Sequence, residues 1–452
     1  MTKTTAKLMF AICLAASSAE VALSAPPALA QAEQDRDSAV RNHVRAFEQS
    51  AHNQDLARFD ADVFDQSYIA RTSRDQRAAL IAQIAEAARE AGDITIDMEG
   101  DDFVLTLTGD AGATRVIFDV AQTPPFAVTN LRVEQGGSAV QALSLSSENL
   151  DATIDDFASR GFAGVIYVRQ NGAVVRERAF GDANRIDTVF GIGSRPIDFT
   201  IAAIAMLAHD GAIDLDAPIT RYFANVPRDK RRITIRQILD DRSGFPDFVH
   251  TDSDWDADLA WISRDELERR VFASPLLFRP GSERRHSHAG YGLLAALVER
   301  VSGQSYPDFL RSRVFEPAGM VRTGFYGDSH GLGVEDFAVG SGPELVGLPN
   351  IPPNWGPTSW LVMGSGGMYS TLGDIMRFNA FVRSANRREV FGDRFLRGNA
   401  QSDGSDRGFE LYSAYVPESD SEFYLFLNKI PDRRAFHALA LGLEGMIGLQ
   451  RR

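Results

Sequence analysis

Cysteine is nearly absent from this chain of 452 residues, whose sequence contains Cys13 and no other cysteine. A single thiol closes no disulfide within a chain, which excludes a fold held together by disulfides. Cys13 also lies in an N-terminal segment that we expect to be removed, which would leave the mature chain without cysteine. Lipid attachment at Cys13 is disfavoured, because Ile12 precedes it where a small residue would be expected.

Long apolar runs are missing too. Two lysines precede the apolar run Leu8 to Ala16, and Glu20 interrupts this segment well short of the roughly 18 residues of a membrane span. Ala28-Leu29-Ala30 then provides small residues for cleavage. This order is typical of a secretory signal peptide, with a short membrane anchor as the alternative. Residues 1–30 are therefore predicted to be a signal peptide, and the mature protein to be periplasmic or secreted without a stable membrane span.

Positive charge is in deficit. The chain has 47 Lys and Arg against 61 Asp and Glu, which gives a formal net charge of -14 at pH 7. Binding to nucleic acid depends on clustered Lys and Arg that displace counterions from the phosphates. The composition therefore excludes nucleic acid as a partner.

Internal repeats and low-complexity tracts are absent, which excludes solenoids and propellers. A chain of this length, with 44% apolar and 24% charged residues, is expected to fold as two or three soluble globular domains. The polar, glycine-containing segment 136–150 is predicted to be a linker.

Residues 35–135 are predicted to form a small α+β domain. Apolar residues recur at helical spacing within 40–47 and 80–84, whereas they alternate within 103–107 and 116–120 as they do in strands. The order of helices followed by strands resembles that of nuclear transport factor-like domains. No cluster of acids, bases or metal ligands stands out in it, so a structural or docking role is expected.

Residues 151–452 are predicted to form a second domain. Val165 to Val168 and Ala173 to Arg178 read as two strands joined by a tight turn, and Phe423 to Leu427 as a third strand. A closing helix is expected at Ala435 to Ile447. Strands at both ends around a helical middle predict one sheet with an inserted helical lobe.

The segment FGIGSRPIDFTIAAIAMLAHDGAIDL, residues 190–215, resembles the nucleophile helix of serine beta-lactamases and penicillin-binding proteins. The resemblance is strongest to class C beta-lactamases and related family VIII-type esterases. It implies an α/β (α+β) fold in which helices flank an antiparallel sheet and a helical lobe is inserted. Four further segments agree with the family in order and spacing: ITIRQILDDRSGFPDF, FRPGSERRHSHAGYGLLAALVERVSGQSY, RVFEPAGM and GSGGMYSTLGDIMRF.

The nucleophile motif departs from the family pattern. In that family the motif is Ser-x-x-Lys, and the lysine accepts the proton of the serine. The resemblance places Ser194 at the serine and Ile197 at the lysine. Isoleucine can neither accept nor donate a proton, and the neighbouring Arg195 stays protonated. The structural interpretation of Ser194 is a plain helix N-cap.

The other two motifs depart as well. The family's Tyr-x-Asn motif reads His286-Ser287-His288 here, and both imidazoles are expected to enter the cleft. The third motif, a cation followed by a variable residue and glycine, corresponds to Ser402-Asp403-Gly404. His288, Ser402, Asp403 and Gly404 are accordingly candidate binding residues. A carboxylate at Asp403 would disfavour substrates that carry a carboxylate.

Two functions remain open. Loss of both lysine and tyrosine predicts an impaired or inactive homologue, a pseudoenzyme that binds a ligand or partner in the old cleft, because a general base contributes about 100- to 10,000-fold to the rate. The ligand would be a small molecule or a peptidoglycan- or ester-type compound, and a protein partner is not specified. The alternative is an active esterase in which His286 is the base for Ser194, although Arg284 and Arg285 would lower the pKa of His286.

Metal binding is a third interpretation of the histidines. His286 and His288, with Asp403, would make an incomplete zinc site, since such sites need three or four protein ligands. Neither hydrolase hypothesis needs a metal or an organic cofactor, and none is expected. The acidic stretch 250–258 is predicted to be a solvated loop over the cleft, with a calcium loop as a distant second interpretation.

Overall fold

The computed structural model divides into two compact units, residues 1–142 with 431–439 and residues 143–430 with 440–452. The predicted signal peptide and the first expected helix, residues 40–47, lie outside the described residues. Within the described residues, the helices are too short or too polar to cross a bilayer. The structure describes residues 60 and 63–449, apart from 100–101, 110–111, 122–125, 138–140, 183, 252–253, 255–259, 343–347 and 406.

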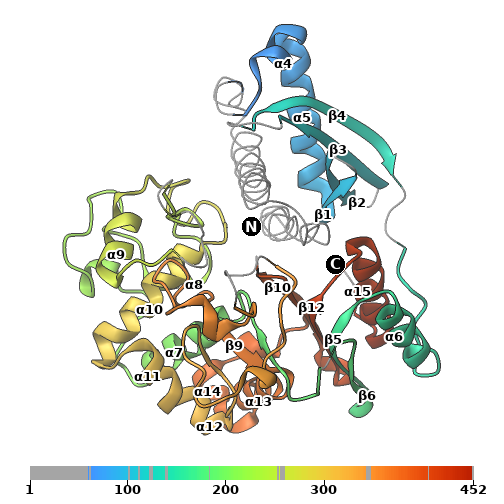
Figure 1. Cartoon of the computed structure of the whole chain (residues 1–452). Coiled ribbons are helices and arrows are strands. Elements are labelled where there is room, and N and C mark those ends of the chain that lie inside the picture. The colour runs from blue at the N-terminus through green and yellow to red at the C-terminus, as the bar shows by residue number, and fades with distance from the viewer. Residues whose placement is uncertain are drawn as a thin grey trace. The chain divides into compact units, whose positions relative to one another are not determined.

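The described N-terminal part of the first unit consists of two helices and a four-stranded antiparallel sheet. Helix α5 lies across all four strands of this sheet (Figure 1). Ile84 of α5 and Val116 of the sheet are fully buried between them. The elements are α4 (Gln66–Arg71), α5 (Arg74–Glu90), β1 (Ala91–Glu99), β2 (Asp102–Gly109), β3 (Gly112–Val120) and β4 (Val128–Gly137), and the strands pair in sequence order.

The second unit is built on a five-stranded antiparallel sheet, which confirms the predicted sheet. The predicted hairpin is present, and its turn residues Asn171 and Gly172 both have positive φ. Tyr424 and Phe426 of β12 belong to the core shared with the helical lobe, whereas the alternating residues Phe423, Leu425 and Leu427 are buried on the other face of the sheet. The strand order is β10 (Asn399–Ser405), β11 (Phe409–Val416), β12 (Ser421–Lys429), β5 (Ala163–Gln170) and β6 (Ala173–Phe180).

Helices surround this sheet, and most of them form a lobe beside it (Figure 1). Helices α7 and α10 pack against each other at the centre of the lobe. Phe199 of α7 makes edge-on contacts with Phe315 and Phe378, at ring centroid distances of 5.3 and 4.8 Å. The helices are α6 (Leu150–Ser159), α7 (Pro196–His209), α8 (Ile235–Leu239), α9 (Arg264–Ala273), α10 (His288–Ser302), α11 (Tyr306–Leu310), α12 (Glu316–Ala318), α13 (Leu372–Arg383), α14 (Arg388–Phe391) and, from Ala440 on, the C-terminal helix α15 (Arg433–Ile447).

A tight turn links a small second sheet to the start of α7. This sheet has the order β7 (Val189–Gly191), β9 (Met368–Thr371) and β8 (Gly324–Phe325). In the turn, Gly193 has φ +51°, and a Cβ on it would lie 2.5 Å from the carbonyl oxygen of Gly404. A side chain at this position would therefore be strained and would collide with β10. The edge strand thus lies directly against the turn that carries Ser194.

A buried ion pair fastens the same turn to the sheet. Arg195 is 2% exposed, and its guanidinium lies 2.8 Å from the carboxylate of Asp403 on β10. The same guanidinium donates hydrogen bonds to Gln401 Oε1 (2.8 Å) and Ser413 Oγ (2.9 Å). The start of α7 is therefore held to β10 and β11 through one side chain.

Replacing Arg195 by methionine should leave the carboxylate of Asp403 buried without its cation. We expect Arg195→Met to lower the free energy of unfolding of the second unit by about 3 to 5 kcal/mol, the usual effect of breaking a buried pair. The double variant Arg195→Met/Asp403→Asn should regain part of that loss. Urea unfolding followed by tryptophan fluorescence measures both changes.

The matched control is Arg388→Met, which breaks an arginine–aspartate pair whose side chains are 63% and 64% exposed. This variant should change the free energy of unfolding by less than about 1 kcal/mol. Equal losses in Arg195→Met and Arg388→Met would contradict the anchoring role of Arg195.

Candidate active site

Ser194, His288 and Asp247 form a continuous chain of hydrogen bonds. Ser194 Oγ lies 3.1 Å from His288 Nε2, and His288 Nδ1 lies 2.7 Å from Asp247 Oδ1. A carboxylate accepts hydrogen bonds only, so the proton of this second bond belongs to Nδ1. The lone pair of Nε2 then faces the serine hydroxyl. This is the arrangement of a serine nucleophile, a histidine base and an aspartate that orients the base.

Helix α10 brings Asp247 and His288 together. Ser287 is the N-cap of α10, where its hydroxyl accepts a hydrogen bond from the backbone N–H of Gly290 and donates one to the carbonyl of Pro246. Asp247 accepts from the backbone N–H of His288 at 2.9 Å through its side chain, and from that of Ala289 at 2.7 Å through its carbonyl. The loop after α8 is thus bound to the first turn of α10.

The ring of His288 is also packed from the side. Phe248 stacks on it with 4.3 Å between ring centroids and 15° between the planes. Phe248 follows Asp247 directly, so one short loop supplies both the hydrogen-bond acceptor and the stacking partner. Rotation of the imidazole out of the serine-facing plane would break both contacts.

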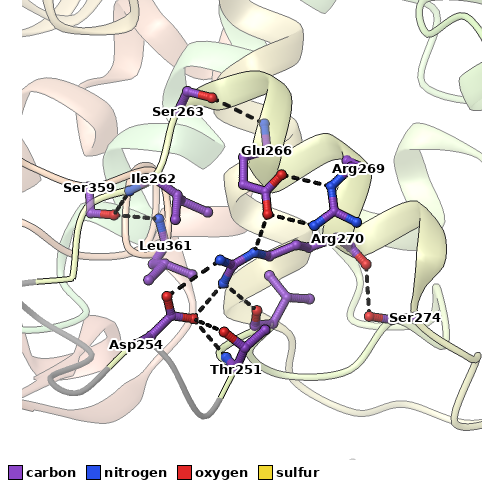
Figure 2. Close-up of polar contacts among 11 residues, drawn as sticks. Thr251, Asp254, Ile262, Ser263, Glu266, Arg269, Arg270, Ser274, Ser359 and Leu361 are labelled. Atoms are coloured by element: carbon purple, nitrogen blue, oxygen red, sulfur yellow. Dashed lines mark hydrogen bonds and ion pairs between the residues drawn. The ribbon is translucent and has the colours of Figure 1, made fainter.

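Arg270 of α9 fixes the far part of that loop. Its guanidinium donates hydrogen bonds to the carbonyl of Val249 and to the carboxylates of Asp254 and Glu266 (Figure 2). The Asp254 side chain is 8% exposed, so the prediction of a solvated acidic loop is wrong at this residue. A buried carboxylate loses its hydration, and the ion pair with Arg270 offsets this desolvation penalty at Asp254. Most of the remaining stretch lies outside the described residues.

Electrostatics favour a neutral imidazole at His288. Burial is the largest influence and lowers its pKa, and the neighbouring His286 adds to this effect, whereas Asp247 opposes it. The pKa of Asp247 is also lowered: burial alone would raise it, but the charge and hydrogen bond of His288 outweigh burial. An ionised aspartate beside a neutral histidine is the resting state that a general base requires.

His286 has a different partner, so the predicted pairing of Ser194 with His286 is corrected. His286 Nδ1 lies 3.2 Å from Asp241 Oδ1, and the serine bonds to His288 instead. The prediction treated the two histidines as equivalent positions of an extended segment. Because α10 begins at His288, the helix start directs that ring to Ser194 while Asp241 holds His286.

The remaining predicted positions lie around the same turn. Ser194 is not the N-cap of α7, since Arg195 occupies that position, and Ile197 packs against the hydrophobic core. Ser402 donates a hydrogen bond to Glu410, and the backbone of Gly404 lies against Gly193.

Asp403 does not act as the expected free carboxylate toward substrate. Its side chain is 3% exposed and is paired with Arg195. Burial raises the pKa of Asp403 to about 6, although Arg195 opposes the shift. Arg195 neutralises Asp403, so the predicted repulsion between Asp403 and carboxylate substrates is weakened.

In the structure, Asp247 and not Asp403 is the third possible metal ligand beside the two histidines. Asp247, His286 and His288 each offer a possible ligand atom within 4.8 Å of the other two, whereas Asp403 does not belong to this group. The 2.7 Å between His288 Nδ1 and Asp247 Oδ1 is a hydrogen-bond length, shorter than the roughly 3.3 Å between two ligands of a tetrahedral zinc ion. We therefore assign this contact to a hydrogen bond.

Asp247 is the residue that sequence reasoning missed. It lies 41 positions before His288, and no local motif connects the two. Its sequence signal is the family-like segment ITIRQILDDRSGFPDF, whose resemblance indicates the fold but does not single out Asp247.

Comparison with known proteins agrees with this fold. A model of the beta-lactamase family matches residues 150–421, more than half of the chain. Esterase EstB of Burkholderia gladioli is 31% identical over 333 residues, which cover 62% of this chain and 82% of the esterase. Penicillin-binding protein 4* of Bacillus subtilis (strain 168) is 25% identical over 255 residues, 51% of this chain and 55% of that protein, so about half of its length is spanned.

Solved structures match the same part of the chain. A beta-lactamase/D-alanine carboxypeptidase from Yersinia pestis, complexed with citrate, aligns with a TM-score of 0.53 and 19% identity over 67% of this chain and 99% of its own. The octameric penicillin-binding protein homologue from Pyrococcus abyssi aligns with a TM-score of 0.52 and 20% identity over 67% and 78%. These likenesses confirm the predicted fold. Together with the family match, they establish that the chain belongs to the beta-lactamase family, among relatives that include penicillin-binding proteins and an esterase.

Proposed function

We propose that this protein is an active serine hydrolase that cleaves carboxylic esters through an acyl-enzyme. Ser194 is the nucleophile, His288 is the general base and acid, and Asp247 orients His288. The observation that carries this proposal is the hydrogen-bond chain from Ser194 Oγ to the carboxylate of Asp247. It supplies a base without the lysine that Ile197 replaces.

The first half of the reaction forms the acyl-enzyme. Ser194 Oγ attacks the ester carbonyl carbon, and its proton passes to His288 Nε2. The imidazolium that forms is stabilised by Asp247 at Nδ1. His288 then gives the proton to the oxygen of the departing alcohol as the carbon–oxygen bond breaks.

The second half releases the acid. A water molecule takes the place of the alcohol and attacks the acyl carbon, while His288 Nε2 accepts the water proton. His288 returns that proton to Ser194 Oγ, and the carboxylic acid leaves. The N-terminal end of the 14-residue helix α7 lies beside Ser194, and its dipole favours negative charge on the carbonyl oxygen in both halves.

Three arguments support esters as the substrate class. The family's third motif provides a cation for substrates that bear a carboxylate, whereas this chain has Asp403, buried against Arg195. An alcohol also leaves more readily than an amine, which suits a site with one histidine for all proton transfers. The relative with the highest identity reported above is itself named an esterase.

A second function, ligand binding without turnover, is favoured by one observation. Ile197 stands where the family has its lysine, and its side chain packs against the hydrophobic core. Under this alternative Ser194 and His288 would line a binding cleft for a small molecule or a peptidoglycan- or ester-type ligand. The labelling experiment below separates the two functions.

Substitution of Ser194 or His288 should remove the activity. Ser194→Ala and His288→Ala are each expected to lower kcat/KM for p-nitrophenyl acetate by about 100- to 10,000-fold, because nucleophile and base act as one unit. Wild-type protein should also form a covalent adduct on Ser194 with a fluorophosphonate, seen by mass spectrometry. No adduct and no turnover in correctly folded wild type would favour the binding function.

The orienting carboxylate gives a further prediction. Asp247→Asn should keep the shape of the loop but lose the negative charge that stabilises the His288 imidazolium, with a drop in kcat of about 100- to 10,000-fold. Asp265→Asn is the control, since that side chain is 85% exposed on α9. A similar kcat in both variants would contradict the proposal that Asp247 orients His288.

The pH dependence follows from the direction of the His288 shift. The base must be neutral, and burial lowers its pKa, so activity should persist below the ordinary histidine value of 6.5. As pH falls through the lowered pKa, His288 becomes protonated and kcat/KM should fall with it. A profile of kcat/KM whose acidic limb lies above pH 6.5 would contradict this assignment.

We further propose that the protein acts outside the cytoplasm, in the periplasm or the medium. The order of two lysines, an apolar run and Ala28-Leu29-Ala30 supports this proposal. Mass spectrometry of the protein from cell fractions should find an exported form that begins near Gln31. An intact N-terminus confined to the cytoplasmic fraction would contradict export.

A further inference from the structure

A second carboxylate–imidazole pair lies beside the proposed base. His286 Nδ1 is 3.2 Å from Asp241 Oδ1, and the rings of His286 and His288 have centroids 4.6 Å apart with planes at 87°. The mechanism proposed above uses only the pair of Asp247 and His288. His286 is partly buried, with 19% of its side chain exposed, and its ring contacts that of His288 while its Nδ1 is bonded to Asp241.

Asp241 holds the segment before α10 at two points. Its side chain pairs with His286, and its carbonyl accepts the backbone N–H of Arg285 at 2.7 Å. Asp241 is 6% exposed and has φ +56°, a conformation that aspartate tolerates better than most residues. The position of the His286 ring is thereby determined before α10 starts.

The ring of His288 is consequently confined by three neighbours. Asp247 binds its Nδ1, Phe248 covers it by stacking, and His286 meets it at nearly a right angle. A hydrogen bond alone leaves an imidazole free to tilt about the bond. The two ring contacts restrict that tilt and keep Nε2 directed at Ser194 Oγ.

Carboxylates dominate the charges around His286. Asp241 is its hydrogen-bond partner, Asp247 and Asp403 act on it through their charges, and His288 and the ring of Tyr291 are its aromatic neighbours. On its own segment, Arg284 lies 3.7 Å from the carboxylate of Asp241 and offsets part of that charge.

The net pKa shifts of the two histidines have opposite signs, although Asp241 and Asp247 act to raise both pKa values. Burial, the largest influence, would lower the pKa of His286, but Asp241, Asp247 and Asp403 outweigh burial and raise it. Burial lowers the pKa of His288, and the positive charge of His286 lowers it further. Near neutral pH the two rings are therefore biased toward different protonation states.

We propose that His286, held by Asp241, is a positioning residue that keeps the ring of His288 in place and biases that ring toward its neutral, proton-accepting form. This inference rests on the proposed function, because it assigns His286 a role through His288. Ser194 bonds to His288, so His286 takes no proton from the nucleophile.

The arrangement also affects the return of the proton. When His288 accepts the proton of Ser194, two imidazolium rings face each other at 4.6 Å between centroids. Their repulsion makes the protonated His288 a stronger acid, which promotes proton delivery to the leaving alcohol. One neighbouring charge thereby keeps the resting base neutral and hastens its second step.

Histidine titration by NMR tests the inference without any need for activity. Protein labelled at the histidine ring carbons would be titrated as wild type, His286→Gln and His286→Phe, with circular dichroism to verify folding. Loss of the positive neighbour should raise the pKa of His288 in both variants. His330→Gln is the matched control, because His330 also pairs with an aspartate, Asp328 at 3.3 Å. An unchanged pKa of His288 in both His286 variants would overturn the inference.

Kinetics supply the second readout. The acidic limb of kcat/KM should move to higher pH in His286→Gln, with a loss of about threefold or more near pH 6 that fades as His286 itself loses its charge at higher pH. His286→Phe retains a ring, so its plateau rate should exceed that of His286→Gln. A loss that is the same at every pH in both variants would indicate a purely structural role and overturn the charge assignment.

The two proposals fail in different ways. Wild-type protein without turnover and without a Ser194 adduct would refute the hydrolase function, while the NMR titration would still measure the coupling between His286 and His288. Turnover that disappears in His286→Gln and His286→Phe as completely as in Ser194→Ala would make His286 the base and overturn the inference.

Discussion

The site depends on one short hydrogen bond, the 2.7 Å contact between His288 Nδ1 and the carboxylate of Asp247. This bond selects the tautomer of His288 and directs Nε2 at Ser194. Without it the family scaffold would present a serine with no oriented base, because Ile197 replaces the usual lysine. The surrounding structure is arranged to hold the two residues together: the N-cap at Ser287 joins the aspartate loop to α10, and Arg270 fixes the rest of the loop.

The two histidines illustrate how environment separates the roles of identical side chains. Both are partly buried, and each has a carboxylate at Nδ1. His288 begins a helix and faces Ser194, whereas His286 lies just before the helix among several carboxylates. The difference of two positions is enough to place one ring against Ser194 and the other against its neighbour. Sequence spacing alone treats them as a pair that points the same way.

The buried ion pair of Arg195 and Asp403 shows how a changed motif acquires a different use. The family's third motif presents a cation on the strand beside the nucleophile, and this chain has an aspartate there. Arg195, which follows Ser194 directly, neutralises that aspartate and joins α7 to β10. Asp403 thus takes part in a structural ion pair beside the turn that carries Ser194. This exchange accords with a substrate that carries no carboxylate.

Much of the architecture could be read from the chain alone, since local patterns encode it: the alternating apolar strands, the tight turn at Asn171 and Gly172, and the family-like segment around Ser194. The same patterns exposed the missing lysine. The base could not be chosen in this way, because Asp247 and His288 are 41 positions apart and meet only when the loop after α8 packs on the start of α10. Long-range packing and burial, which no local spacing records, determine which histidine faces the serine and which protonation state it prefers.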